Sequence, residues 1–157
     1  MKHLFFPLVV SLLFTYFQPA WGQSSQNQPA TTLNHIALNV VDLEKSTAFY
    51  KEVLNLQMIP EPFHDGLHTW FSIGGNAQLH LIQRATETIA HDKNTHLCFS
   101  VRSMDDFIAT LDKHNIDRIN WVGDSKEPTL RVDGVKQIYF QDPDGYWVEV
   151  NDDFPEE

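Results

Sequence analysis

Two similar strand-like segments of the sequence, residues 34–40 and 95–101, each carry a histidine in the second position. One further potential ligand follows in the last apolar stretch of each half. Neutral imidazole nitrogens and carboxylate oxygens are suitable ligands for divalent transition metals. Burying four ionisable groups together without a cation would cost on the order of several kcal/mol. The pattern therefore predicts one divalent metal ion (Zn, Ni, Mn, Fe or Co), bound by His35, His80, His96 and Glu149.

Alternation of apolar and polar residues explains how these side chains could reach a common space. In the first segment, Ile36 and Leu38 take one face of a strand and leave His35 on the other. The same alternation directs His96 and Glu149 away from the apolar faces of their own strands. We therefore expect the four side chains to project from four strands into one cavity.

A helix and several strands follow each histidine strand, so the chain consists of two copies of one unit. The first copy has a predicted strand at 35–40, a helix at 43–54 and strands at 57–59, 68–73 and 77–83. The second has a strand at 96–101, a helix at 104–114 and strands at 118–122, 129–132, 135–141 and 146–150. Two βαβββ modules, at about 33–84 and 95–152, predict a single α+β domain, a half-open barrel with the helices outside.

Capping and turn residues support these boundaries. Asp42 and Ser103 are good N-cap residues for the two helices, and Asn55 tolerates the left-handed conformation that ends a helix. Residues 74–76 (Gly-Gly-Asn) predict a hairpin turn. Residues 142–145 (Asp-Pro-Asp-Gly) fit a type I turn.

The N-terminal residues are typical of a secretory signal peptide at 1–22. A short positive start is followed by an apolar run at 4–17, and Ala20-Trp21-Gly22 is a small-residue cleavage site. The apolar run is shorter than the ~20 residues needed to span a bilayer. We expect cleavage and export to the periplasm or medium, with residues 23–32 forming a flexible polar leader before the domain at 33–152.

Charge and cysteine content restrict the partners. The net charge of −10 argues against nucleic acid, whose binding requires neutralised phosphates, and against an anionic membrane surface after signal cleavage. Cys98 is the single cysteine, so the chain cannot form an internal disulfide, and we expect this thiol to be a small core residue. A small-molecule substrate is the expected partner.

Several motifs resemble those of the vicinal oxygen chelate superfamily, the glyoxalase/bleomycin-resistance/dioxygenase group, and the pattern is closest to glyoxalase I-like lyases. The motifs are LNHIAL at 33–38, FYKEVLNL at 49–56, QLHLI at 78–82, THL at 95–97 and DPDGYWVE at 142–149. The resemblance implies paired βαβββ modules with metal ligands on the first and last strands of each. It departs from glyoxalase I at His80, where Glu or Gln is common, and there it is similar to fosfomycin-resistance transferases.

The resemblance implies a metal-dependent lyase or isomerase that chelates two adjacent oxygens of a small substrate, of lactoylglutathione lyase-like type. Glu149 is then the candidate general base. Two alternatives stay open. One is an Fe(II) extradiol-type dioxygenase that uses His35, His96 and Glu149, and the other is a non-catalytic binding or resistance protein. A homodimer is common in this group.

Cations in the second half offer a further expectation about the substrate. Lys126, Arg131 and Lys136 lie in its variable region. They could bind an anionic substrate, or they could be ordinary surface charges.

Overall fold

The computed structural model describes residues 31–155, so the predicted signal peptide and most of the predicted leader lie outside the described residues. From Leu33 onward the described chain belongs to one compact unit. Within residues 31–155, no helix has the length and apolar character needed to cross a membrane.

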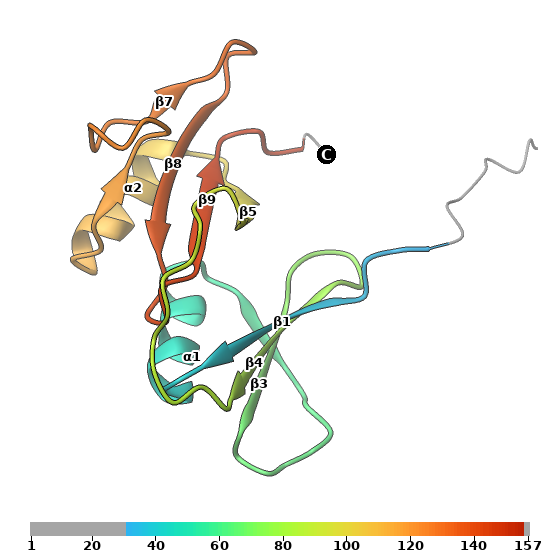
Figure 1. Ribbon diagram of the computed structural model, residues 1–157. Helices are drawn as coiled ribbons and strands as arrows, with labels where there is room; N and C mark the ends of the chain where they lie inside the picture. Colours follow the sequence, from blue (N-terminus) through green and yellow to red (C-terminus); the bar gives the residue numbers. More distant parts are fainter. Residues whose placement is uncertain (1–30, 156–157) are drawn as a thin grey trace, which may run out of the picture. The chain divides into compact units, whose positions relative to one another are not determined.

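The first module forms a four-stranded sheet (Figure 1). Strand β1 runs parallel to β4, and β4, β3 and β2 then follow in antiparallel order across the sheet. Helix α1 connects β1 to β2. The elements are β1 (His35–Val40), α1 (Leu43–Glu52), β2 (Gln57–Ile59), β3 (His68–Ser72) and β4 (Gln78–Gln83).

The second module repeats this topology. Its first strand again runs parallel to its last, in the order β5-β9-β8-β6, and β7 pairs with β8 outside that path. The elements are β5 (His96–Ser100), α2 (Met104–Lys113), β6 (Arg118–Ile119), β7 (Thr129–Leu130), β8 (Lys136–Gln141) and β9 (Trp147–Asn151). The prediction of an α+β fold built from paired βαβββ modules is confirmed.

The predicted caps are formed. The side chain of Asp42 accepts a hydrogen bond from Lys45 N at 3.0 Å, and that of Ser103 accepts one from Asp106 N at 3.2 Å. Asn55 has a φ of 52°, as expected after a helix end. Both N-caps satisfy backbone N–H groups that an α-helix leaves without intrahelical partners.

Two predicted strands of the second module are shorter than expected. The predicted strands 118–122 and 129–132 are reduced to the two-residue strands β6 and β7. The side chain of Asn120 accepts hydrogen bonds from Gly123 N at 2.6 Å and Asp124 N at 3.2 Å, which turns the chain away from the sheet. A local side-chain interaction thus replaces the sheet hydrogen bonds.

The apolar faces of both sheets and the inner sides of both helices share one core. Phe140 of β8 lies between the modules, with ring centroids 6.2 Å from Phe49 of α1 and 5.7 Å from Phe107 of α2. Leu79 and Val148 are fully buried on β4 and β9. Because one core includes residues of both modules, the two sheets are held through their helix-covered sides.

Buried hydrogen bonds connect α1 to the turn between β8 and β9. Ser46 donates to Asp144 Oδ2 at 2.5 Å, and the hydroxyl of Tyr50 donates to Asp142 Oδ2 at 2.7 Å. Burial raises the pKa of Asp142, and burial together with the Asp142 charge raises the pKa of Tyr50 well above its usual value. The turn predicted at 142–145 therefore also links the two modules.

Candidate metal site

The first pair of predicted ligands lies on neighbouring strands of the first sheet. His35 of β1 and His80 of β4 stack with ring centroids 4.4 Å apart and an angle of 9° between their planes. Trp70 of β3, which pairs with His80 in the sheet register, stacks on the other side of His80 at 3.9 Å and 2°. The three rings form one continuous stack that fixes the orientation of His80.

Hydrogen bonds leave one ring nitrogen of each of these histidines with a lone pair. His35 Nδ1 lies 2.7 Å from Asn34 Oδ1, and His80 Nε2 lies 2.8 Å from Gln78 Oε1. An amide oxygen can only accept, so these two nitrogens carry protons, and Nε2 of His35 and Nδ1 of His80 are available as ligands. Burial lowers the pKa of His80, and the neighbouring histidines lower it further, which favours the neutral ring that a metal requires.

The second pair lies on neighbouring strands of the second sheet. His96 Nδ1 donates to the backbone oxygen of Lys93 at 2.8 Å, so Nε2 keeps the lone pair. That nitrogen lies 3.2 Å from Glu149 Oε2. A backbone carbonyl that fixes the imidazole tautomer is characteristic of metal-binding histidines.

Three side chains donate hydrogen bonds to the Glu149 carboxylate, which is itself buried. The hydroxyl of Tyr139 donates to Oε2 at 2.5 Å, and Asn151 Nδ2 donates to Oε1 at 3.3 Å. The thiol of Cys98 donates to Oε1 at 3.4 Å. Burial raises the pKa of Cys98 to about 12, with a further contribution from Glu149, so the thiol stays protonated.

Cys98 corrects one expectation from the sequence. The residue is exposed on the Glu149 side of the sheet, although its hydrogen bond to Glu149 is partly buried, and it is not a core residue. Alternation from His96 places it on the polar face, because residues two positions apart on a strand share a face. Its thiol also accepts a hydrogen bond from Asn151 Nδ2 at 3.2 Å.

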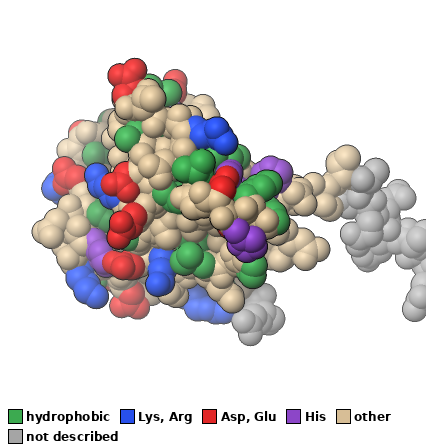
Figure 2. Space-filling model, turned by 90° about the horizontal axis from the view of Figure 1, so that it is seen from below, with side chains coloured by type: hydrophobic (Ala, Val, Ile, Leu, Met, Phe, Trp, Pro, Cys, Tyr) green, Lys and Arg blue, Asp and Glu red, His purple; other side chains and the backbone are tan. Residues whose placement is uncertain are grey.

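The two pairs do not meet within one chain. Among residues 31–155 there is no group of three or more His, Cys, Asp or Glu side chains positioned to hold a metal. The described residues of one chain therefore do not bring the four side chains together, and the assignment of each residue as a ligand stays a prediction. Alternation determines the face that a side chain takes on its own sheet, but the packing of the two sheets is determined by the shared core. Figure 2 shows histidine side chains beside hydrophobic ones on the face seen from below.

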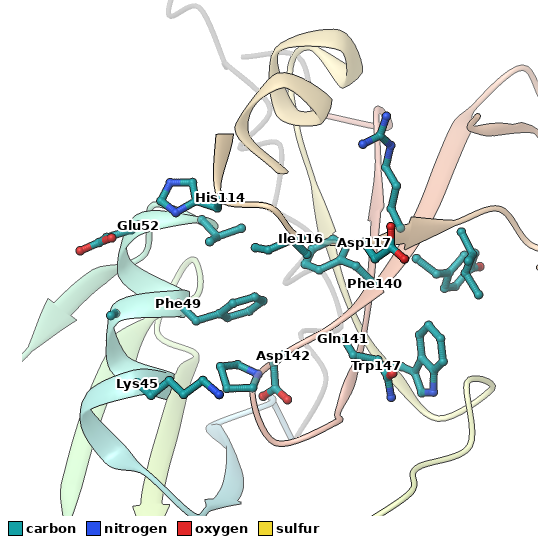
Figure 3. A pocket seen from close by; sticks show the side chains of 16 residues that line it. Lys45, Phe49, Glu52, His114, Ile116, Asp117, Phe140, Gln141, Asp142 and Trp147 are labelled. Atoms are coloured by element: carbon teal, nitrogen blue, oxygen red, sulfur yellow. The ribbon is translucent and has the colours of Figure 1, made fainter. Parts of the chain in front are cut away.

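One cavity among the described residues lies apart from the predicted site. A cavity of about 550 Å³ lies between α1 and the second sheet, and none of the four predicted ligands lines it. Phe49 reaches into it from α1, toward Ile116 and Phe140 (Figure 3). Tyr139, which donates to Glu149, also lines it, and so does Trp147, which pairs with His96 in the sheet register. This cavity therefore adjoins the second pair.

Two aromatic residues that the sequence patterns did not single out hold the ligand pairs. Tyr139 pairs with Glu149 in the register of β8 and β9, and Trp70 pairs with His80 in that of β3 and β4. Alternation in 136–141, with Ile138 and Phe140 on the core face, could have placed Tyr139 beside Glu149. The indole N–H of Trp70 is buried without a hydrogen-bond partner among the described residues, so stacking holds this ring.

Comparisons with known proteins agree with this architecture. Residues 32–150 match the model of the Glyoxalase/Bleomycin resistance protein/Dioxygenase superfamily, so the chain belongs to this superfamily. It is 28% identical to a lactoylglutathione lyase of Pseudomonas putida, over 82% of this chain and 91% of that protein. It is 26% identical to the metallothiol transferase FosB of Staphylococcus epidermidis, over 77% of this chain and 81% of that protein.

A solved structure supports the same fold. The glyoxalase/dioxygenase from Nostoc punctiforme superposes with a TM-score of 0.63 at 26% identity, covering 80% of this chain and 92% of that one. The fold is therefore glyoxalase-like, and the relatives include both a lyase and a transferase.

Proposed function

We propose that this protein is an exported, metal-dependent enzyme of glyoxalase type, a lyase or isomerase that acts on two adjacent oxygens of a small substrate. The observation that carries the proposal is the pairing of ligands: the first and last strands of each module carry two neighbouring side chains whose lone pairs could bind a metal. Three imidazoles and one carboxylate suit Zn, Ni, Mn, Fe or Co. Superfamily members typically use a divalent metal, which supports the same conclusion.

Two copies of the chain complete the site in this proposal. His35 and His80 of one copy face His96 and Glu149 of a second copy, and twofold symmetry then creates two equivalent sites. Support comes from the separation of the pairs in one chain and from the exposure of His35 and Cys98 on the two ligand faces. A homodimer is thus part of the proposed function.

The residues of the chain divide the chemistry between them. When bound, the metal supplies Lewis acidity to the chelated substrate oxygens. Glu149 removes a proton from the substrate carbon, because it is a carboxylate beside the expected position of the substrate. Tyr139 and Asn151 orient Glu149, and the backbone oxygen of Lys93 orients His96.

A complementation experiment tests the site and the dimer together. One variant carries His35→Ala and His80→Ala, and the other carries His96→Ala and Glu149→Ala. Neither variant alone should bind metal tightly. After unfolding and refolding as an equal mixture, half of the dimers contain both variants, and each of these has one intact site of two. About a quarter of the parent metal content should return, by elemental analysis.

Each possible outcome tests a different part of the proposed function. No metal in the mixture, with about one ion per chain in the parent protein, would show that all four ligands act within one copy. No metal in the parent protein, even after reconstitution, would reject the metal-dependent function and leave a ligand-binding protein. An Fe(II)-dependent uptake of O₂ with catechols would identify the dioxygenase alternative.

A second candidate function is a metal-dependent transfer of a thiol to a small molecule. His80 favours it, since the sequence resembles fosfomycin-resistance transferases at this position, and FosB is among the relatives. Mass spectrometry of an epoxide substrate incubated with metal-loaded protein and a small thiol distinguishes the two reactions. A thiol adduct supports transfer, whereas isomerisation of a hemithioacetal supports the glyoxalase-type reaction.

Export is a separate part of the proposal. Its support is the signal-peptide pattern at 1–22. N-terminal sequencing of the protein released from the periplasm of an expression host should begin at Gln23. A protein that is retained in the cytoplasm and begins at Met1 would contradict export.

A further inference from the structure

Two cations flank the second ligand pair in a chain whose net charge is −10. Lys93, just before β5, places Nζ 5.2 Å from the ring centroids of both Trp121 and Tyr139. Its ammonium group also donates a hydrogen bond to the backbone oxygen of Trp121. Because the hydroxyl of Tyr139 contacts Glu149, the Lys93 charge is held beside the proposed metal site.

Arg131 directly follows β7 and lies on the same side of the second sheet. Thr129 pairs with Gln137, and residues two positions apart share a face, so Arg131 lies on the face that carries Gln137 and Tyr139. Its guanidinium contacts Asp133 at 2.5 Å, and its side chain remains 37% exposed. A guanidinium has five N–H donors, so a single carboxylate does not use them all.

Electrostatic effects agree with this placement. The hydrogen bond to Asp133 raises the pKa of Arg131, and the negative charge of Glu149 adds to this increase. The guanidinium of Arg131 therefore lies within electrostatic reach of Glu149. Lys126, in contrast, is exposed and forms an ion pair with Asp117.

Trp121 adds a flat apolar surface to the two cations. Its side chain is 45% exposed and lies 5.9 Å from the Tyr139 ring at an angle of 54°. Thr129 Oγ1 accepts a hydrogen bond from Trp121 N at 2.9 Å, which fixes the backbone at this position. An exposed indole beside fixed cations suits a flat ligand that carries negative charge.

We propose that Lys93, Arg131 and Trp121 form an oxyanion subsite, so that the substrate carries a carboxylate, phosphonate or phosphate group next to its metal-chelating oxygens. Lys93 and Arg131 bind the anionic group, and Trp121 covers the adjoining apolar part. This inference rests on the proposed metal-dependent function and names the class of its substrate.

Two catechols that differ by one carboxylate test the subsite. Catechol and 3,4-dihydroxybenzoate offer the same vicinal oxygens, and only the second carries an anionic group. Their dissociation constants are measured for metal-loaded protein by calorimetry and by quenching of tryptophan emission. A charge-assisted hydrogen bond changes affinity by about tenfold or more, so we expect 3,4-dihydroxybenzoate to bind about tenfold more tightly. Added salt should reduce this preference.

Matched variants assign the preference to residues. Lys93→Met keeps the backbone oxygen that orients His96, and both Lys93→Met and Arg131→Met should bring the ratio of the two dissociation constants close to one. Lys126→Met removes the same charge elsewhere and should leave the ratio unchanged. A parent protein without the preference, or a preference that persists in both site variants, overturns the inference while metal binding stands. A parent protein that binds no metal overturns the proposed function and this inference with it.

Discussion

The hydroxyl of Tyr139 should contribute strongly to metal affinity, although we do not expect it to bind the metal itself. It donates the shortest hydrogen bond to Glu149, at 2.5 Å, and Tyr139 is almost completely buried. A hydrogen bond to a charged group contributes about 1.5–3 kcal/mol, and loss of a residue that orients a ligand lowers metal affinity about 10–100-fold. Since tenfold corresponds to about 1.4 kcal/mol, both arguments predict the same range for Tyr139→Phe.

The assay is competition for Zn²⁺ between the protein and a fluorescent chelator of known affinity. Tyr146→Phe is the control, because its hydroxyl lies 3.3 Å from the backbone of Asn39 and contacts none of the proposed ligands. We expect weaker binding in Tyr139→Phe alone, by about 10–100-fold. Equal affinity in both variants and the parent protein would refute the view that Tyr139 orients Glu149 for a metal.

Three further predictions concern stability. Tyr50→Phe should lower the free energy of unfolding in urea by about 2 kcal/mol, because the fully buried hydroxyl bonds the buried carboxylate of Asp142; an unchanged midpoint would contradict this. The pKa of Asp142 is higher in the folded protein than in the unfolded chain. Asp142 therefore stabilises the fold while it is protonated, and this stabilisation is lost as the pH rises through the folded-state pKa. Asp142→Asn should therefore become more stable relative to the parent protein as the pH rises above about 4, and a constant difference would exclude this linkage. Gly145→Ala should destabilise by more than about 1 kcal/mol in thermal unfolding, since φ is 86° and a Cβ would lie 3.1 Å from Ile89 O; a stabilised variant would show that the turn relaxes freely.

Local sequence patterns predicted the structural features that depend on residues close together in the chain. The N-caps Asp42 and Ser103, the left-handed Asn55 and the faces of the ligand strands follow from short-range rules of helix and strand geometry. These rules also predicted the order of the helices and strands, because each module repeats the same arrangement of elements. The predicted fold class therefore needed no long-range information.

Contacts between residues far apart in the sequence could not be predicted from these local rules. The hydrogen bond from Tyr50 to Asp142 joins residues 92 positions apart, and no periodicity in the sequence indicates it. The same applies to the arrangement of the two sheets, which separates His35 and His80 from His96 and Glu149. Alternation assigns a face to each side chain, but it contains no information on which face of another sheet, or of another copy, lies opposite.

The two ligand pairs are held by different forces, and this affects how freely each can change in evolution. His80 lies between the planar rings of Trp70 and His35, and stacking accepts any flat group of similar size. Glu149 instead receives three directed hydrogen bonds that require a carboxylate at that point. A planar amide in place of His80 would keep the stack while altering metal preference, whereas a neutral apolar group in place of Glu149 would leave buried donors unsatisfied. In the proposed metal site, position 80 is thus the ligand position where a substitution would change the metal preference with the least disturbance of the surrounding packing.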